Sequence, residues 1–187
     1  MLTNRTHNIP LAVVAMASGL RVNRIEKLIH EGRFRPANDT VPGVGRVWTE
    51  YDIIRLSIVG ALADVADFSE VLDVLRRLEA EGHLQREDPI FAVLCGPWGG
   101  TRRIELCGSD RLLECFQGAL NVGDAGRGIH KQSVTVIWLT KIAGHALLRL
   151  NEELARRARL QAQRDACAAW DAVHGSGASE GDGTSVA

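Results

Sequence analysis

Several residues near the N-terminus have the side chains and the spacing needed to contact a nucleic acid. The apolar residues of segment 21–31 recur at helical spacing, which predicts one buried face: Val22, Ile25, Leu28 and Ile29. The outer face carries hydrogen-bond donors and positive charge: Arg21, Asn23, Arg24 and Lys27. A guanidinium can bind guanine through two hydrogen bonds, and an amide can bind adenine in the same way. We therefore expect Arg21, Asn23 and Arg24 to contact base edges, and Lys27 to contact backbone phosphate.

The segment before these residues is predicted to position them. Pro10 suits the first turn of a helix over 11–17, Gly19 interrupts that helix, and Leu20 is expected to be a buried plug in the turn. Gly32 ends the second helix, as a C-terminal glycine should. A helix, a glycine turn and a second helix with a basic outer face form a helix-turn-helix, whose second helix enters the major groove of DNA.

A short basic wing is predicted over residues 33–48. Its prolines and glycines argue against a helix, and short runs around Phe34 and over 46–48 are expected to pair as a hairpin. In this wing Arg46 is expected to neutralise a backbone phosphate or to enter the minor groove. Trp48 is interpreted as a core residue at the base of the wing.

Two further helices complete the predicted N-terminal domain, residues 1–85. Thr49 is a favoured N-cap residue, and Asp52 completes a variant of the capping box for a helix over 50–63. Ser69 is expected to cap a fourth helix over 70–81, which Gly82 ends.

The C-terminal half, residues 88–173, is predicted to be a small α+β unit that serves dimerisation or regulation. Strands are expected at 90–94, 103–107 and 133–139, with a turn over 95–100. Ser109 or Asp110 is expected to cap a helix that runs to about residue 120, and a loop over 121–128 follows. A long helix over 140–173 then precedes a glycine- and serine-rich tail, 174–187, which is expected to be disordered. The predicted fold class is mainly α with a small β component.

Three leucines of the long helix form an apolar stripe: Leu147, Leu150 and Leu154. The stripe is either the seam of a homodimer or a surface that packs on the predicted strands. It covers under two heptads, which is too short for a coiled coil. A homodimer is attractive because one small helix-turn-helix rarely binds DNA tightly by itself.

The charge distribution favours a single basic face. The chain has 187 residues and a formal net charge of −1, which argues against a nonspecific nucleic-acid binder. Residues 1–50, however, carry seven lysines and arginines against four acids, whereas residues 51–89 carry four against nine. A local basic surface on a nearly neutral chain suits a module that touches phosphates with one side only.

Other kinds of site are not expected. The four cysteines include no CxxC pair, and Cys95, Cys107, Cys115 and His130 lack zinc-ligand spacing, so the cysteines are interpreted as small buried residues. The glycine-rich segment 123–128 lacks the end of a phosphate-binding loop, and no catalytic constellation stands out. We therefore expect no metal, no cofactor and no enzymatic activity. The chain has no apolar run of membrane-spanning length and no signal-peptide pattern, so a cytoplasmic protein is expected.

Residues 10–80 resemble the DNA-binding domain of the mercury-resistance-regulator (MerR) family of transcription factors. Segment 11–25 is similar to the family's first helix, its Thr-Gly-Val turn and its Ser-Val-x-Thr-Ile-Arg motif, and Gly32 falls at the glycine of the Glu-x-x-Gly-Leu helix exit. Segment 46–52 resembles Tyr-Arg-x-Tyr-Thr-x-x-Asp, and Phe68 to Val74 resembles Gly-Phe-Ser-Leu-x-x-Ile. The resemblance implies a winged helix-turn-helix with these DNA contacts: Arg21, Asn23, Arg24, Lys27 and Arg46.

The chain also departs from the family pattern. Lys27 and Leu28 stand where the family usually has a tyrosine pair, and the wing is longer and contains two prolines. The apparent strands near 90–107 replace the long dimerisation helix that directly follows the family's fourth helix. The family's mechanism of promoter unwinding is therefore not carried over.

Three functions follow, in order of preference. The first is a sequence-specific transcriptional regulator that binds double-stranded DNA as a homodimer, with helix 21–31 in the major groove and wing 33–48 on the backbone. The second is an excisionase-like architectural factor that bends DNA. The third is an adaptor whose helix-turn-helix meets a protein. The sequence identifies no operator and no small-molecule effector.

Overall fold

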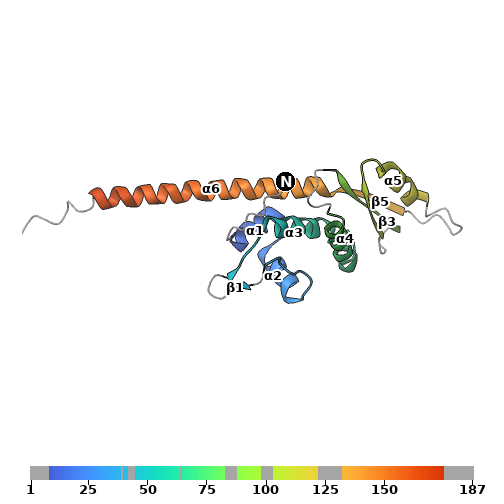
Figure 1. Ribbon diagram of the computed structural model, residues 1–187, viewed down its shortest axis with the longest axis horizontal. Coiled ribbons are helices and arrows are strands. Elements are labelled where there is room, and N and C mark those ends of the chain that lie inside the picture. The colour runs from blue at the N-terminus through green and yellow to red at the C-terminus, as the bar shows by residue number, and fades with distance from the viewer. Residues whose placement is uncertain are drawn as a thin grey trace, which may run out of the picture. The chain divides into compact units, whose positions relative to one another are not determined.

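The computed structural model describes residues 9–38, 40–41, 45–63, 65–82, 88–97, 103–121 and 132–174. In this part of the chain the structure is mainly helical, with a small antiparallel sheet and a long C-terminal helix, as the sequence predicts (Figure 1). The chain divides into two compact units, Met1–Leu150 and Asn151–Ala187. The two halves that the sequence suggests both contribute to the first unit, where α4 of the first half packs next to β4 of the second.

Four helices and a short hairpin form the N-terminal module. The helices are α1 (Leu11–Ser18), α2 (Val22–His30), α3 (Glu50–Leu62) and α4 (Phe68–Ala80), and the hairpin pairs β1 (Thr40–Val41) with β2 (Gly45–Arg46). Helices α2 and α4 each bury one apolar side, as the sequence predicts for α2, and α3 is buried along most of its length. Figure 1 shows α1 and α3 next to each other, with α2 on their outer side. This core holds α2 in place while its polar face stays outside.

The predicted hairpin forms and includes Arg46, but its first strand does not lie around Phe34. The pairs are Thr40 with Arg46 and Val41 with Gly45, so Phe34 is not in a strand. Phe34 instead ends the turn after α2, where its N–H donates to the Leu28 carbonyl at 3.0 Å, and its ring is buried. Pro36 then follows without an N–H to donate to a strand partner. The hairpin therefore forms further along the chain.

The start of α4 also differs from the prediction. The helix begins at Phe68 with Asp67 as its N-cap residue, two positions before the predicted cap Ser69. Asp67 is itself a favoured N-cap residue type, so the sequence contained two possible starts. Four residues of this helix are buried: Val71, Val74, Leu75 and Leu78.

The C-terminal half of the first unit is a three-stranded antiparallel sheet with one covering helix. The strand order is β4 (Arg103–Gly108), β3 (Ile90–Pro97), β5 (Gln132–Trp138). The covering helix α5 (Leu112–Asn121) packs Cys115 and Leu112 against Val93 and Cys107 of the sheet. The strands predicted from the apolar alternation of β4 and from the β-branched residues of β5 are therefore present.

Three boundaries in this half were predicted wrongly. Residues 95–97 were expected in a turn but belong to β3, because β5 pairs with them through Val134, Ser133 and Gln132. Helix α5 begins only after a turn over 109–111, in which the Arg111 N–H donates to the Gly108 carbonyl. Leu139 opens a helix and does not end a strand. Most of the predicted loop, 122–128, and the tail from residue 175 lie outside the described residues.

Helix α6 (Leu139–His174) has 36 residues and crosses the boundary between the two units. Leu139, Ala146 and Leu150 are buried in the first unit. Of the predicted stripe, Leu150 is only 1% exposed, whereas Leu147 and Leu154 are half-buried. From residue 155 onward every described residue is exposed. None of the helices in the described part of the chain has the length and apolar character of a membrane span.

Candidate nucleic-acid interface

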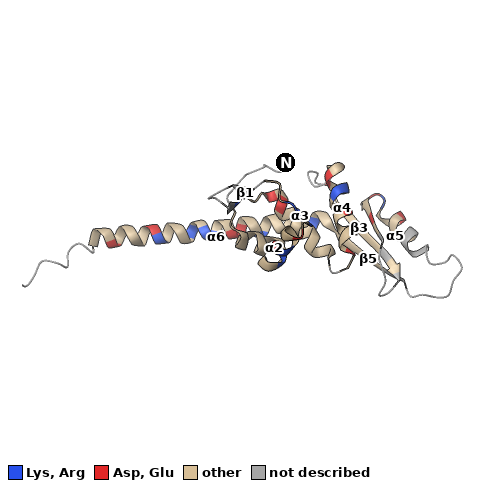
Figure 2. Cartoon of the chain, turned by 90° about the horizontal axis from the view of Figure 1, so that it is seen from below, with Lys and Arg blue, Asp and Glu red and all other residues tan. Residues whose placement is uncertain are grey.

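Helix α2 presents the four predicted contact residues on its exposed face. Arg21 is the N-cap residue with extended backbone, and Asn23, Arg24 and Lys27 follow within the helix; all four are exposed. On the opposite face Ile25 and Leu28 are buried, and Val22 and Ile29 are half-buried. Figure 2 marks the positive residues of α2. The predicted division of this helix into a buried and an exposed face is therefore confirmed.

The turn between α1 and α2 fixes the direction in which α2 leaves. Gly19 has φ +74°, a left-handed conformation that glycine adopts without a steric penalty. Leu20 was expected to be a buried plug and is half-buried. Its side chain packs on Gly60 of α3, where an added Cβ would lie 3.2 Å from Leu20 Cδ2. A glycine in α3 thus provides the space into which the turn packs.

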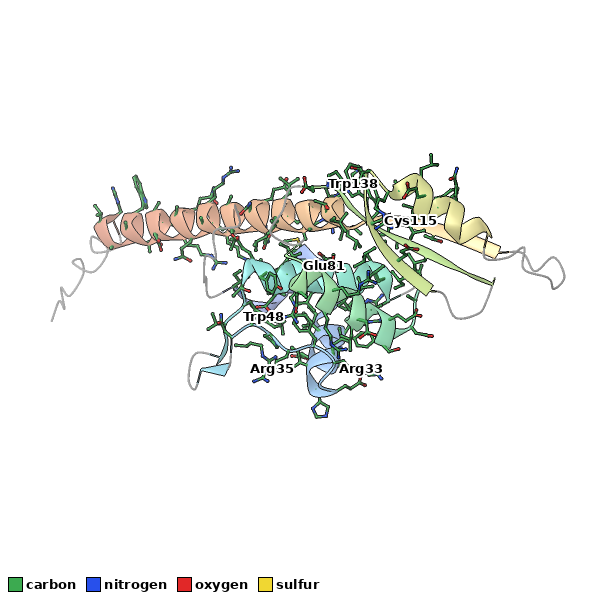
Figure 3. All side chains as sticks on the ribbon, turned by 45° about the vertical axis from the view of Figure 1, so that its right-hand side comes forward. Arg33, Arg35, Trp48, Glu81, Cys115 and Trp138 are labelled. Atoms are coloured by element: carbon green, nitrogen blue, oxygen red, sulfur yellow. The ribbon has the colours of Figure 1, made fainter. Side chains whose placement is uncertain are left out.

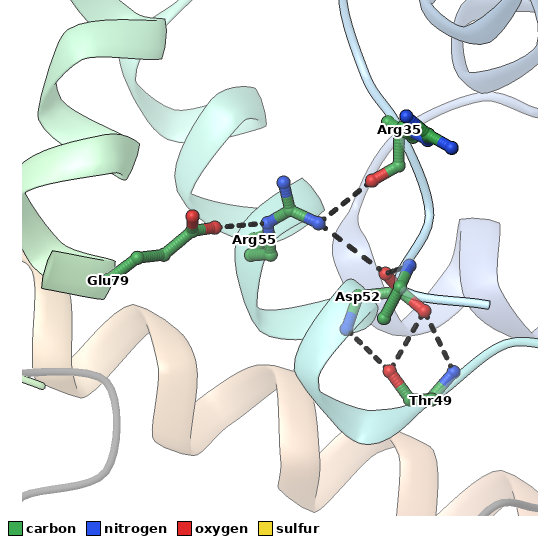
Figure 4. A network of polar contacts seen from close by, with 6 residues as sticks. Arg35, Thr49, Asp52, Arg55 and Glu79 are labelled. Atoms are coloured by element: carbon green, nitrogen blue, oxygen red, sulfur yellow. Dashed lines mark hydrogen bonds and ion pairs between the residues drawn. The ribbon is translucent and has the colours of Figure 1, made fainter.

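Asp52 forms a buried polar centre that ties the predicted wing to α3 (Figure 4). Its Oδ2 accepts hydrogen bonds from the Thr49 N–H at 3.0 Å and the Thr49 hydroxyl at 2.8 Å. Its Oδ1 accepts from the Ala37 N–H at 2.8 Å. The Asp52 N–H in turn donates to Thr49 Oγ1 at 3.1 Å, which completes the capping box. The predicted cap is confirmed, and the contact with Ala37 adds a role that the local sequence does not reveal.

Arg55, one turn further along α3, joins three parts of the module. Its Nη1 donates to the Arg35 carbonyl at 2.9 Å and lies 3.6 Å from Asp52 Oδ1, while its Nε pairs with Glu79 Oε1 of α4 at 2.7 Å (Figure 4). Its guanidinium also lies over the ring of Phe34, 4.8 Å from the centroid. Sequence reasoning missed Arg55, because its partners are 20 and 24 residues away along the chain.

Tyr51 lies beside this network, with the Arg55 guanidinium 5.6 Å from the centroid of its ring. Burial raises the pKa of the Tyr51 hydroxyl, and the nearby Glu79 carboxylate raises it further. The phenol therefore stays neutral at physiological pH and can donate a hydrogen bond.

Arg46, in the segment predicted as a wing, lies over an aromatic ring. Trp48 is 2% exposed, which confirms its interpretation as a core residue. The Arg46 guanidinium lies 5.8 Å from the centroid of that ring, and the side chain is half-buried. Stacking of this kind limits the motion of an arginine while its N–H groups remain able to bind an anion.

Arg33 is a further cation near α2 that was not predicted as a contact. Arg33 and Arg35 follow α2 in the chain, and Figure 3 labels them on either side of that helix. The Arg33 guanidinium lies 5.1 Å from the centroid of the Phe68 ring, and its Nε lies 3.2 Å from Glu31 Oε2. The sequence feature that could have indicated Arg33 is the pair of arginines that flank Phe34, directly after the glycine that ends the helix.

The cysteines do not form a metal site in the described part of the chain. Cys107 and Cys115 are buried as expected, whereas Cys167 is exposed, contrary to the interpretation as a buried residue. Burial and the hydrogen bond with Cys115 raise the pKa of Cys107 to about 12. Among the described residues no group of three potential metal ligands lies together. The side chain of Cys95 and all of His130 lie outside the described residues.

Comparisons with protein-family models and with curated proteins find no match to this chain.

Proposed function

We propose that this protein is a sequence-specific regulator of transcription that binds double-stranded DNA. In this proposal the N-terminal module is a winged helix-turn-helix of the kind found in the MerR family. Helix α2 enters the major groove, and the segment 33–48 lies on the backbone. The observation that carries the proposal is the exposed row of donors on α2: Arg21, Asn23, Arg24 and Lys27.

The dimensions and the support of α2 suit this role. A helix with its side chains is about 10–12 Å across, and the major groove of B-DNA is about 12 Å wide. The packing of Leu20 on Gly60 supports one end of the helix, and the Asp52 and Arg55 network supports the segment after its other end. Specific recognition requires such preorganisation, since a donor that moves freely loses entropy when it binds a base.

We also propose that the protein binds DNA as a homodimer. Two modules on one duplex contact two half-sites about 34–36 Å apart and so combine their affinities. Because Leu150 is buried within its own chain, it is not available as part of an exposed seam. The exposed stretch of α6 beyond it is the better candidate, because a single helix without packing partners is marginally stable in water.

The test of specificity compares two variants of α2 by fluorescence anisotropy on a duplex from upstream of the protein's own gene. Arg24→Ala is expected to reduce discrimination between the cognate base pair and a substituted one by about 1–3 kcal/mol. Lys27→Ala is expected to weaken binding to all duplexes alike and to reduce the salt slope by about 1. Arg76→Ala is the control, since Arg76 is an exposed arginine of α4 paired with Asp73. If both α2 variants bound like this control, the assignment of α2 as the recognition helix would be wrong.

A further inference from the structure

A hollow of about 260 Å³ lies between the C-terminal part of α2 and the start of α4. Its walls contain three cations, one acid and two apolar side chains: Arg24, Lys27, Arg33, Glu31, Leu28 and Phe68. The cations come from two turns of α2 and from the residue after Gly32, so the local backbone brings them to one place.

The charges around this hollow are not balanced. Glu31 lies between two of the cations, with Oε1 3.7 Å from Lys27 Nζ and Oε2 3.2 Å from Arg33 Nε. Arg24 has no ion-pair partner among the described residues. The lining of the hollow therefore carries three positive side chains and one carboxylate, a local excess of two formal positive charges. An anion in the hollow would relieve their mutual repulsion.

Arg33 is the cation whose position is most constrained. Its guanidinium lies against the Phe68 ring, and its Nε faces Glu31. A guanidinium carries five N–H donors in one plane, so stacking on a ring leaves donors at its edge available. Such an edge matches the geometry of two phosphate oxygens.

We infer that this hollow binds a phosphate group, with Arg33 as the principal donor, Lys27 as a supporting cation and Glu31 as a competing anion. Arg24, the proposed base contact, adds positive charge at the wall of the hollow. This inference rests on the proposed DNA binding, because the phosphate group that we expect in the hollow belongs to the DNA backbone beside the major groove. It also extends the contact surface beyond the residues predicted from the sequence, because Arg33 lies outside α2. A small phosphorylated molecule offers the same chemistry from another source, and the experiment below separates the two.

The first part of the experiment measures DNA affinity of the full chain across a salt series. Arg33→Gln is expected to reduce the magnitude of the slope of log K against log salt by about 0.9 per protomer, without changing the preference between sequences. Glu31→Gln removes the competing carboxylate and is expected to tighten binding by about two- to fivefold. This factor corresponds to the free energy of an exposed ion pair, which the phosphate would no longer have to displace. Arg76→Gln is the matched control and should leave both quantities unchanged. Equal thermal midpoints establish that the variants are folded.

The second part titrates inorganic phosphate into the free protein and follows the backbone amide shifts of residues 31–33 and 68 by NMR. Saturable shifts that disappear in Arg33→Gln support the hollow as a phosphate site. If the protein shows these shifts but binds no DNA, the phosphate group comes from a small molecule. Specific DNA binding that Arg33→Gln and Glu31→Gln both leave unchanged overturns the inference while the proposed function stands. Absence of both DNA binding and phosphate shifts overturns the two together.

Discussion

The substitution Asp52→Ala removes the acceptor at the centre of the module and should strongly destabilise the first unit. The carboxylate is fully buried and accepts hydrogen bonds from two backbone N–H groups, those of Thr49 and Ala37, and from the Thr49 hydroxyl. A buried donor left without a partner costs about 1–3 kcal/mol, and loss of a helix cap costs about 1 kcal/mol. Arg55 would also lose one of its two acidic partners. We expect the free energy of unfolding to fall by about 3–5 kcal/mol, the usual cost of breaking a buried ion pair.

Urea denaturation followed by circular dichroism measures this change, with Asp73→Ala as the control. Asp73 pairs with Arg76 at 2.7 Å on the exposed side of α4, where such pairs contribute about 0–1 kcal/mol. Asp52→Asn should fall between the two variants, because the amide keeps the size of the side chain and one oxygen acceptor. If Asp52→Ala were within about 1 kcal/mol of the control, the network would not stabilise the module and would not hold the segment after α2 in place.

Two further predictions concern single side chains. The ion pairs with Arg156 and Arg157 lower the pKa of Glu153 from 4.5 to about 2, so their support for the helix is complete above pH 4.5 and is lost as the pH falls toward 2. A carboxyl titration of Glu153 by NMR with a midpoint near 4.5 would contradict this. Cys167 should react rapidly with a thiol reagent in the native protein, whereas Cys107 should react only on unfolding, because it is buried and its pKa is about 12. Equal rates for the two thiols, measured by mass spectrometry of the labelled peptides, would show that the sheet and α5 do not protect Cys107.

The helices of the N-terminal module could be predicted because their signals are local. Val22, Ile25, Leu28 and Ile29 repeat within one helix, and Thr49 with Asp52 forms a cap within one turn. These patterns depend only on neighbours along the chain, so the sequence alone identifies them.

The errors have a common physical origin in contacts between distant residues. The hairpin strands have only two residues each, too few for an alternating pattern, and their position follows from the turn that Phe34 closes with Leu28. The extension of β3 to Pro97 depends on pairing with β5, some 35 residues later in the chain. The same reason explains why the exposed face of α2 could be predicted and the ion pair between Arg55 and Glu79 could not.

We propose that α2 and its basic surroundings bind DNA specifically. The most direct test measures binding of the purified full chain to labelled duplex from upstream of its own gene, across a salt series and with random duplex as competitor. We expect a complex that resists random competitor and whose log affinity falls with log salt at a slope of about −0.9 for each phosphate neutralised. Absence of any complex near ~50 mM salt, where phosphate contacts are strong, would contradict it and favour an adaptor that meets another protein.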